Sequence, residues 1–125
     1  MIQVKSLVEP FLDEDGFRIL VENNWPLELD KKKVKVNLWL KELAPSPELI
    51  NWPVTGSISK EEFREKYRDQ LRRKKTLLNY IKKMEKEQGT ITLLYSDISK
   101  ESVMILENKL NGYKTIRGSV DRIHG

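Results

Sequence analysis

The length, composition and charge of the chain limit its fold and its chemistry. Its 125 residues fit one domain, and 34% charged against 38% hydrophobic residues predicts a soluble globular protein with a heavily charged surface. The chain has no cysteine, which excludes disulfides, thiolate nucleophiles and zinc sites built on sulfur. It has neither a signal-peptide core nor an apolar run near the ~20 residues of a membrane span, so we expect a cytoplasmic protein with no membrane contact. Dense Lys and Glu without Cys are also typical of thermophile proteins.

The basic residues gather in two runs, Lys31–Lys33 and Arg72–Lys75, within a formal net charge of +4. Neither run is interleaved with aromatic residues that could stack on bases. We therefore interpret both runs as solvated surface, one on a turn and one on a helix. Phosphate contacts alone would make any nucleic-acid binding weak, non-specific and salt-sensitive.

The N-terminal part of the chain predicts two strands. Ile2-Gln-Val-Lys5 alternates apolar and polar residues, which is typical of a strand with one buried face. Phe17–Val21 is an apolar run in which Arg18 is the only charge, bounded by Asp15-Gly16 and Trp25-Pro26. This run predicts a buried, central strand, and the carboxyl end of such a strand is where ligands bind in α/β sheets.

The stretch over residues 34–40 has the clearest period-two pattern in the chain. Val34, Val36, Leu38 and Leu40 fall on one face, and polar residues with Trp39 fall on the other. The pattern predicts a half-exposed edge strand. We expect Trp39 to cover a neighbouring helix, with ligand binding as the alternative.

Helices are predicted over the middle of the chain. Ser46 with Pro47 starts a helix that Pro53 limits to about two turns. Ser59-Lys-Glu-Glu62 is a capping box. Two consecutive helices, or one long kinked helix, should follow and end near Gly89, with this apolar stripe: Phe63, Tyr67, Leu71, Leu77, Leu78, Ile81 and Met84.

The last third predicts a buried strand and a final helix. Thr90–Ser96 is β-branched and almost free of charge, and Ser99 should cap a helix that stops at Asn111-Gly112. A short strand around Tyr113–Ile116 and a loose tail complete the chain. We therefore predict a single α/β domain over residues 1–125, with a mainly parallel sheet flanked by helices. Residues 17–21 and 91–95 should be parallel and central, because the crossover between them is long and helical.

Several segments together resemble the YeaO-like family (domain of unknown function 488), over about residues 2–110. The most specific is Leu38-Trp-Leu-Lys-Glu-Leu-Ala-Pro-Ser46, and the others are Asp15-Gly-Phe-Arg-Ile-Leu-Val21, Trp25-Pro26, Glu48-Leu49, the Phe63, Tyr67 and Leu71 stripe, and Thr92-Leu-Leu-Tyr-Ser96. The resemblance implies a small α/β protein from a family with no established activity.

The chain departs from this family at polar positions. The family usually reads Asp-Arg-x-Trp-Pro-Arg-Gly after the first buried strand, where this chain has Glu22-Asn-Asn-Trp-Pro-Leu-Glu28. A further arginine after the Pro-Ser block is Ile50 here, and the Asn-His before the last helix is missing. The resemblance therefore implies a divergent member that keeps the scaffold and replaces the site.

The replaced positions change the expected charge of this edge. The family's arginines are suited to grip an anion, whereas Glu22, Glu28 and Asp97 occupy the edge here. We expect the edge to have lost anion binding, unless Arg18 or Lys100 reaches it.

Most site chemistries are excluded by missing residues. His124, the only histidine, lies in the tail, which argues against a Ser-His-Asp triad and a histidine metal site. Neither Gly-x-Gly-x-x-Gly nor Gly-Lys-Ser/Thr occurs. We expect no cofactor and no metal.

Polar residues follow both buried strands, at ends that should share one edge of the sheet. Glu22 and Asp97 are the candidate catalytic pair, and Asn23, Asn24 and Ser96 are candidate ligand-binding residues. The alternative is that Glu22 pairs with a lysine and Asp97 caps a turn.

Three functions follow from these observations. The first is a diverged, non-catalytic binding or interaction domain, in which exposed Trp39 and Trp52 contact a partner or a second copy. The second is an enzyme that acts on a small substrate at Glu22 and Asp97. The third is a weak, non-specific nucleic-acid binder. The sequence leaves the ligand, the partner, the oligomeric state, the pathway and any catalytic activity open.

Overall fold

A four-stranded parallel sheet lies at the centre of the structure, a computed structural model that describes residues 1–26 and 34–112. The strands are arranged in the order β1-β4-β2-β3, and every neighbouring pair is parallel. Their bounds are β1 Ile2–Ser6, β2 Phe17–Leu20, β3 Leu38–Trp39 and β4 Ile91–Tyr95. The predicted pairing of residues 17–21 with residues 91–95 is confirmed, since β2 lies beside β4 with Ile19 opposite Leu93.

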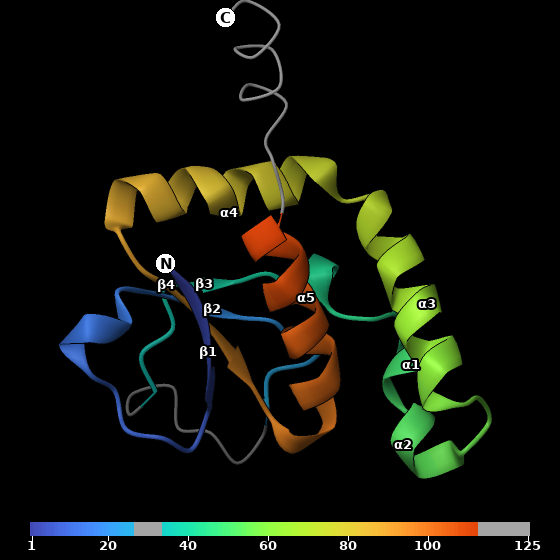
Figure 1. Cartoon of the computed structure of the whole chain (residues 1–125). Coiled ribbons are helices and arrows are strands. Elements are labelled where there is room, and N and C mark those ends of the chain that lie inside the picture. Colours follow the sequence, from blue (N-terminus) through green and yellow to red (C-terminus); the bar gives the residue numbers. More distant parts are fainter. Residues whose placement is uncertain (27–33, 113–125) are drawn as a thin grey trace, which may run out of the picture.

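The α-helices of the described residues occur at two places along the chain, and Figure 1 shows them coloured from green to yellow before β4 and orange to red after it. Four of them lie between β3 and β4, and α5 follows β4 after a 3-10 turn. Their bounds are α1 Pro47–Ile50, α2 Trp52–Thr55, α3 Lys60–Arg72, α4 Lys75–Gln88 and α5 Lys100–Gly112. The 3-10 turns are η1 Asp13–Asp15, η2 Lys41–Leu43 and η3 Asp97–Ser99. None of the helices in residues 1–26 and 34–112 has the length and apolar character that a membrane crossing requires.

One face of the sheet is covered by the helices, which supply most of the apolar core. Ile19 and Leu93 belong to this core, together with the predicted stripe of α3. Phe63, Tyr67 and Leu71 are each at most 1% exposed. The Ser59 hydroxyl accepts a 3.1 Å hydrogen bond from the Glu62 amide, so the predicted helix cap is confirmed.

The other face of the sheet is covered by loops rather than helices. Leu7, Leu20 and Leu94 form a small second cluster there, with Trp25, Val34 and Val36 packed against it. The described parts of the β1–β2 and β2–β3 connections contain no α-helix, and they contribute Leu7, Trp25, Val34 and Val36 to this cluster. The predicted α/β fold, a mainly parallel sheet flanked by helices, is therefore confirmed, with the apolar helix residues packed on one face of the sheet.

Gly16 fixes where β2 begins beside β4. Its φ of +66° lies in the left-handed region, and a β-carbon there would stand 2.3 Å from the Thr90 carbonyl oxygen. That oxygen accepts a 3.0 Å hydrogen bond from the Phe17 amide. Glycine is required for both the turn and the close approach of the two backbones.

Three local predictions are wrong in detail. Only Leu38–Trp39 of residues 34–40 forms a strand, and the four apolar residues do not share a face, because Val34 packs on the loop side and Leu40 on the helix side. The Ser46 hydroxyl does not cap α1; it accepts a hydrogen bond from Gln70. Ser99 ends η3, and its hydroxyl donates to Glu22 instead of capping α5.

Some of the predictions fall on residues outside the described part of the chain. These are the predictions for Leu27, Glu28, Lys31–Lys33, His124 and the tail strand.

Candidate functional site

Glu22 lies at the carboxyl end of β2 and joins it to the end of β4. Its side chain is 6% exposed, and Oε1 accepts hydrogen bonds from the Ser96 amide at 2.9 Å and from the Ser99 hydroxyl at 2.5 Å. The Ser96 amide also donates to the Ser99 oxygen at 2.9 Å. Glu22 therefore links the end of β2 to the end of β4 through hydrogen bonds. Within the described residues it forms no ion pair with a lysine.

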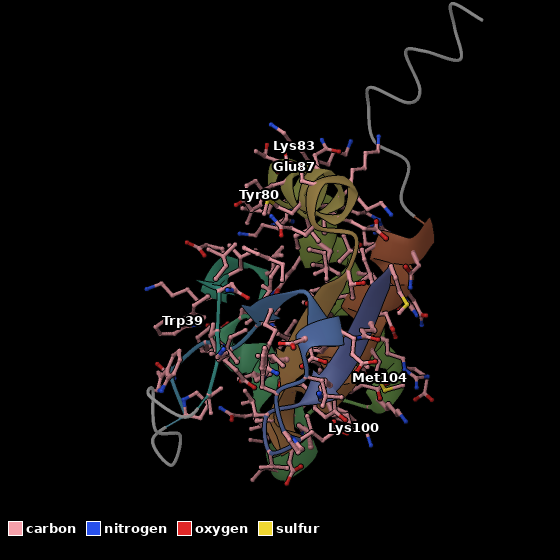
Figure 2. The ribbon with its side chains drawn as sticks, turned by 90° about the vertical axis from the view of Figure 1, so that its left-hand side faces the viewer. Trp39, Tyr80, Lys83, Glu87, Lys100 and Met104 are labelled. Carbon is pink, nitrogen blue, oxygen red and sulfur yellow. The ribbon has the colours of Figure 1, made fainter. Side chains whose placement is uncertain are left out.

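The backbone at Glu22 is held equally firmly. The Trp39 indole donates a 2.7 Å hydrogen bond to the Glu22 carbonyl, and its ring meets Trp25 edge-on with centroids 5.8 Å apart. Trp39 thus covers the end of β2 rather than a neighbouring helix, and 37% of it stays exposed. Its place at the sheet edge is visible in Figure 2.

A cavity of about 340 Å³, here called the exit pocket, opens at these strand ends. Four of the predicted site residues line it, namely Glu22, Asn23, Asn24 and Ser96. The residues that the sequence did not indicate are Trp25, Pro26, Pro47, Ile50, Asn51 and Ile98. Helix α1 and the turn after β4 bring these residues together, and no periodicity connects segments so far apart in the chain.

Asp97 does not belong to the exit pocket. It is the exposed first residue of η3, and within residues 1–26 and 34–112 its carboxylate makes no hydrogen bond or ion pair. The structure therefore does not bring Glu22 and Asp97 together as a carboxylate pair in one cavity. Nor does any group of three or more His, Cys, Asp or Glu among the described residues have the arrangement to hold a metal ion.

Two positions where the family resemblance leads us to expect arginine line the exit pocket. These positions hold Asn23 and Ile50. Asn23 uses its amide nitrogen to donate a 2.8 Å hydrogen bond to the Pro45 carbonyl. The third position, Leu27, lies outside the described residues. In the described lining of the pocket, neutral side chains therefore occupy the positions at which the family resemblance implies arginines.

Neither of the two basic residues considered for this edge reaches the exit pocket. Arg18 is 2% exposed and lies on the loop-covered face, with its NH1 group 2.6 Å from Asp15 Oδ2. Lys100 is exposed at the start of α5, and Figure 2 shows it with Met104 on the flank away from Trp39.

Trp52 does not form an exposed contact surface. It is partly buried, and its ring stacks on Phe63 with centroids 5.1 Å apart. Of the two tryptophans predicted to meet a partner, only Trp39 remains exposed enough to do so.

Comparison with known proteins places this geometry in a family. The model of the family described as "Inactive DUF488-N3 subclade" matches residues 1–115. The uncharacterised protein YeaO of Escherichia coli (strain K12) is 34% identical over 76% of this chain and 82% of its own. The uncharacterised protein Rv3073c of Mycobacterium tuberculosis (strain ATCC 25618 / H37Rv) is 27% identical over 89% of this chain and 94% of its own. No solved structure matches the chain significantly. The resemblance to YeaO-like proteins is thereby confirmed, and the chain belongs to the inactive DUF488-N3 subclade.

Proposed function

We propose that the protein is a non-catalytic binding domain that takes a small, uncharged ligand into the exit pocket. The observation that carries this proposal is the state of Glu22, whose Oε1 is occupied by the Ser96 amide and the Ser99 hydroxyl. Oε1 is committed to these two donors, so only Oε2 would be left to exchange a proton with a substrate, and no second carboxylate lines the pocket in the described residues to complete an acid–base pair.

The lining of the exit pocket supports an uncharged ligand. Glu22 is its only charged residue in the described part of the chain, and three asparagines and Ser96 supply neutral donors and acceptors. Trp25, Ile50 and Ile98 supply apolar surface. A cavity of about 340 Å³ with a few polar groups among apolar walls suits a compact, partly flat molecule with hydrogen-bonding edges.

Membership of a subclade described as inactive also supports binding without catalysis. The alternative, an enzyme acting through Glu22, makes a different prediction for Glu22→Gln. That change keeps an oxygen that can accept from the Ser96 amide and the Ser99 hydroxyl, but it removes the carboxylate. If Glu22 is catalytic, the variant should lose turnover. If Glu22 is structural, the variant should still bind the ligand.

A fragment screen by protein-observed NMR tests the proposal directly. We expect uncharged planar compounds to shift the amide signals of residues 22–25 and 96–98. Ile50→Arg should abolish these shifts, because Ile50 lines the pocket and a long cationic side chain there would occupy it. Val54→Arg is the matched control, since Val54 is 81% exposed on α2 and does not line the pocket. Shifts that survive Ile50→Arg, or only anionic hits, would contradict the proposal.

A further inference from the structure

A second cavity, here called the basic pocket, lies between η2 and the junction of α3 with α4. Its volume is about 360 Å³. It borders the exit pocket at Asn23, which lines both cavities. Its charged lining residues are Lys41, Glu42, Arg73 and Lys74.

Hydrogen bonds from α3 fix the lining residues Leu43 and Ser46 of the basic pocket in position. The buried Tyr67 hydroxyl donates to the Leu43 carbonyl at 2.6 Å. Gln70 accepts from the Ser46 amide at 3.1 Å and donates to the Ser46 hydroxyl at 2.9 Å. Burial raises the pKa of Tyr67, so its hydroxyl stays protonated as a donor. The pocket is therefore preformed rather than dependent on a ligand to order it.

Three positively charged residues line the basic pocket, and the Lys41 ammonium nitrogen lies 5.8 Å from the centroid of the Trp39 ring. Lys41 comes from η2, and Arg73 and Lys74 come from the α3–α4 junction. Within residues 1–26 and 34–112 none of these three forms an ion pair, although the neighbouring Arg72 pairs with Asp69. Glu42 is the only carboxylate among the described lining residues.

From this arrangement we propose that the basic pocket binds a phosphate group carried by a small molecule. Three cations, none of them in an ion pair within the described residues, stand against one carboxylate and leave a net positive charge that a dianion would neutralise. Arg73 can offer two parallel donors to phosphate oxygens, and the two lysines add point charges. The basic pocket shares only Asn23 with the exit pocket, and none of its charged residues lines the exit pocket, so this proposal does not depend on the ligand proposed there.

A concave site with converging cations favours a small phosphate ester over a nucleic acid. Nucleic-acid binding draws on basic charge spread along a surface, and its affinity falls steeply with salt. Here the basic run at residues 72–75 is divided, because Arg72 turns to Asp69 while Arg73 and Lys74 line the pocket.

The test is a titration of the purified protein with inorganic phosphate and with a nucleoside monophosphate at low ionic strength. We expect saturable binding with a dissociation constant on the order of 1 mM or tighter. The NMR signals that shift should be those of residues 41–46 and 70–74. The double variant Lys41→Gln/Arg73→Gln should weaken binding about tenfold or more, equivalent to about 1.4 kcal/mol.

The control variant is Arg68→Gln/Lys83→Gln, which removes the same charge from exposed positions outside the pocket. Figure 2 shows Lys83 on the outer side of α4. It should change the affinity less than about twofold, so equal weakening by both variants would reduce the effect to net charge and overturn the proposal. Absence of saturation by phosphate, or binding of duplex DNA without binding of either small anion, would overturn it as well.

Discussion

The two faces of the sheet are buried in different ways, although the same four strands form both. On the helix-covered face the strands place Ile19, Ile91 and Leu93 in a core shared with apolar helix residues. On the loop-covered face they place Arg18 and Thr92, both at most 2% exposed. A helix satisfies its own backbone and can offer a purely apolar stripe, whereas a buried loop needs polar partners for its backbone groups.

The polar side chains of the loop-covered face supply those partners. Asp15 accepts from the Leu12 amide at 3.1 Å and pairs with both Arg18 and Lys5. The Thr92 hydroxyl donates to the Asp15 carbonyl at 2.6 Å. The charges on this face therefore determine the path of the loop after β1, while the helix-covered face supplies most of the apolar burial.

The largest effect should come from the apolar face. Phe63→Ala should lower the free energy of unfolding by about 3–5 kcal/mol, because it removes a ring that stacks between Trp52 and Tyr67 in the core. Urea unfolding followed by circular dichroism measures the loss. Val54→Ala on the surface is the control and should cost under about 0.5 kcal/mol. A loss for Phe63→Ala as small as that of a helix-cap variant would mean that α3 packs by another side.

The polar face should respond with a signature that the apolar face lacks. Asp15→Asn should cost about 3 kcal/mol at pH 7, because Arg18 would remain buried without an anion, and its Nε already lacks an acceptor in the described residues. Burial alone would raise the pKa of Asp15, but the Leu12 amide with Lys5 and Arg18 outweighs it and lowers the pKa below its usual range.

This lowered pKa gives the pH dependence of the Asp15 contribution its sign. A carboxylate whose pKa is lower in the folded state stabilises the fold above the unfolded value of about 3.9, and that contribution is lost as pH falls through the folded pKa. The cost of Asp15→Asn should therefore shrink when unfolding is measured at pH 3. The cost of Phe63→Ala should be the same at both pH values, and a parallel decline in the two variants would refute the assignment.

A smaller effect is expected where the strands end. Glu22→Ala should cost about 1–3 kcal/mol, because the Ser96 amide and the Ser99 hydroxyl lose their acceptor. Glu22→Gln keeps an oxygen acceptor and should cost clearly less. Thermal unfolding of the two variants measures the difference. An equal loss of stability in both would indicate that the charge of Glu22 contributes more than its hydrogen bonds to Ser96 and Ser99.

The smallest effect is expected at the helix cap of α3. Ser59→Ala should cost about 0.5–2 kcal/mol, since it removes the acceptor of the Glu62 amide. Ser57→Ala, at an exposed position just outside the helix, is the matched control. A cap effect as large as that of Phe63→Ala would mean that the helix layer depends on local hydrogen bonds more than on burial.

The sequence predicted what depends on local pattern. The β2 and β4 runs, the α3 stripe and the Ser59 cap are all periodic or positional signals, and each is confirmed. The prediction of one strand over residues 34–40 was wrong in extent, because strict alternation of apolar and polar residues is normally typical of a single strand. Here the chain crosses the sheet edge, so Val34 and Leu40 end on opposite faces.

The candidate site was predicted less completely, because it depends on tertiary contacts. Residues Glu22, Asn23, Asn24 and Ser96 could be placed at one edge from strand direction alone. The use of Ser99 as a donor to Glu22 could not, since a Ser before a helix normally reads as a cap. The basic pocket was missed because Arg73 and Lys74 belong to a run interpreted as solvated helix surface, and only the break between α3 and α4 turns them toward η2.

The strand order has a consequence for the timing of folding during synthesis. β4 lies between β1 and β2, yet it begins 71 residues after the end of β2 and 85 residues after the end of β1. While the ribosome still holds residues 91–95, β1 has no strand to pair with and β2 can pair only with the two-residue β3. The sheet must therefore assemble late and through distant contacts, which are slow to form. A chain interrupted before residue 91 would contain helices whose apolar stripe is not covered by the sheet. Such a chain is prone to aggregation and proteolysis.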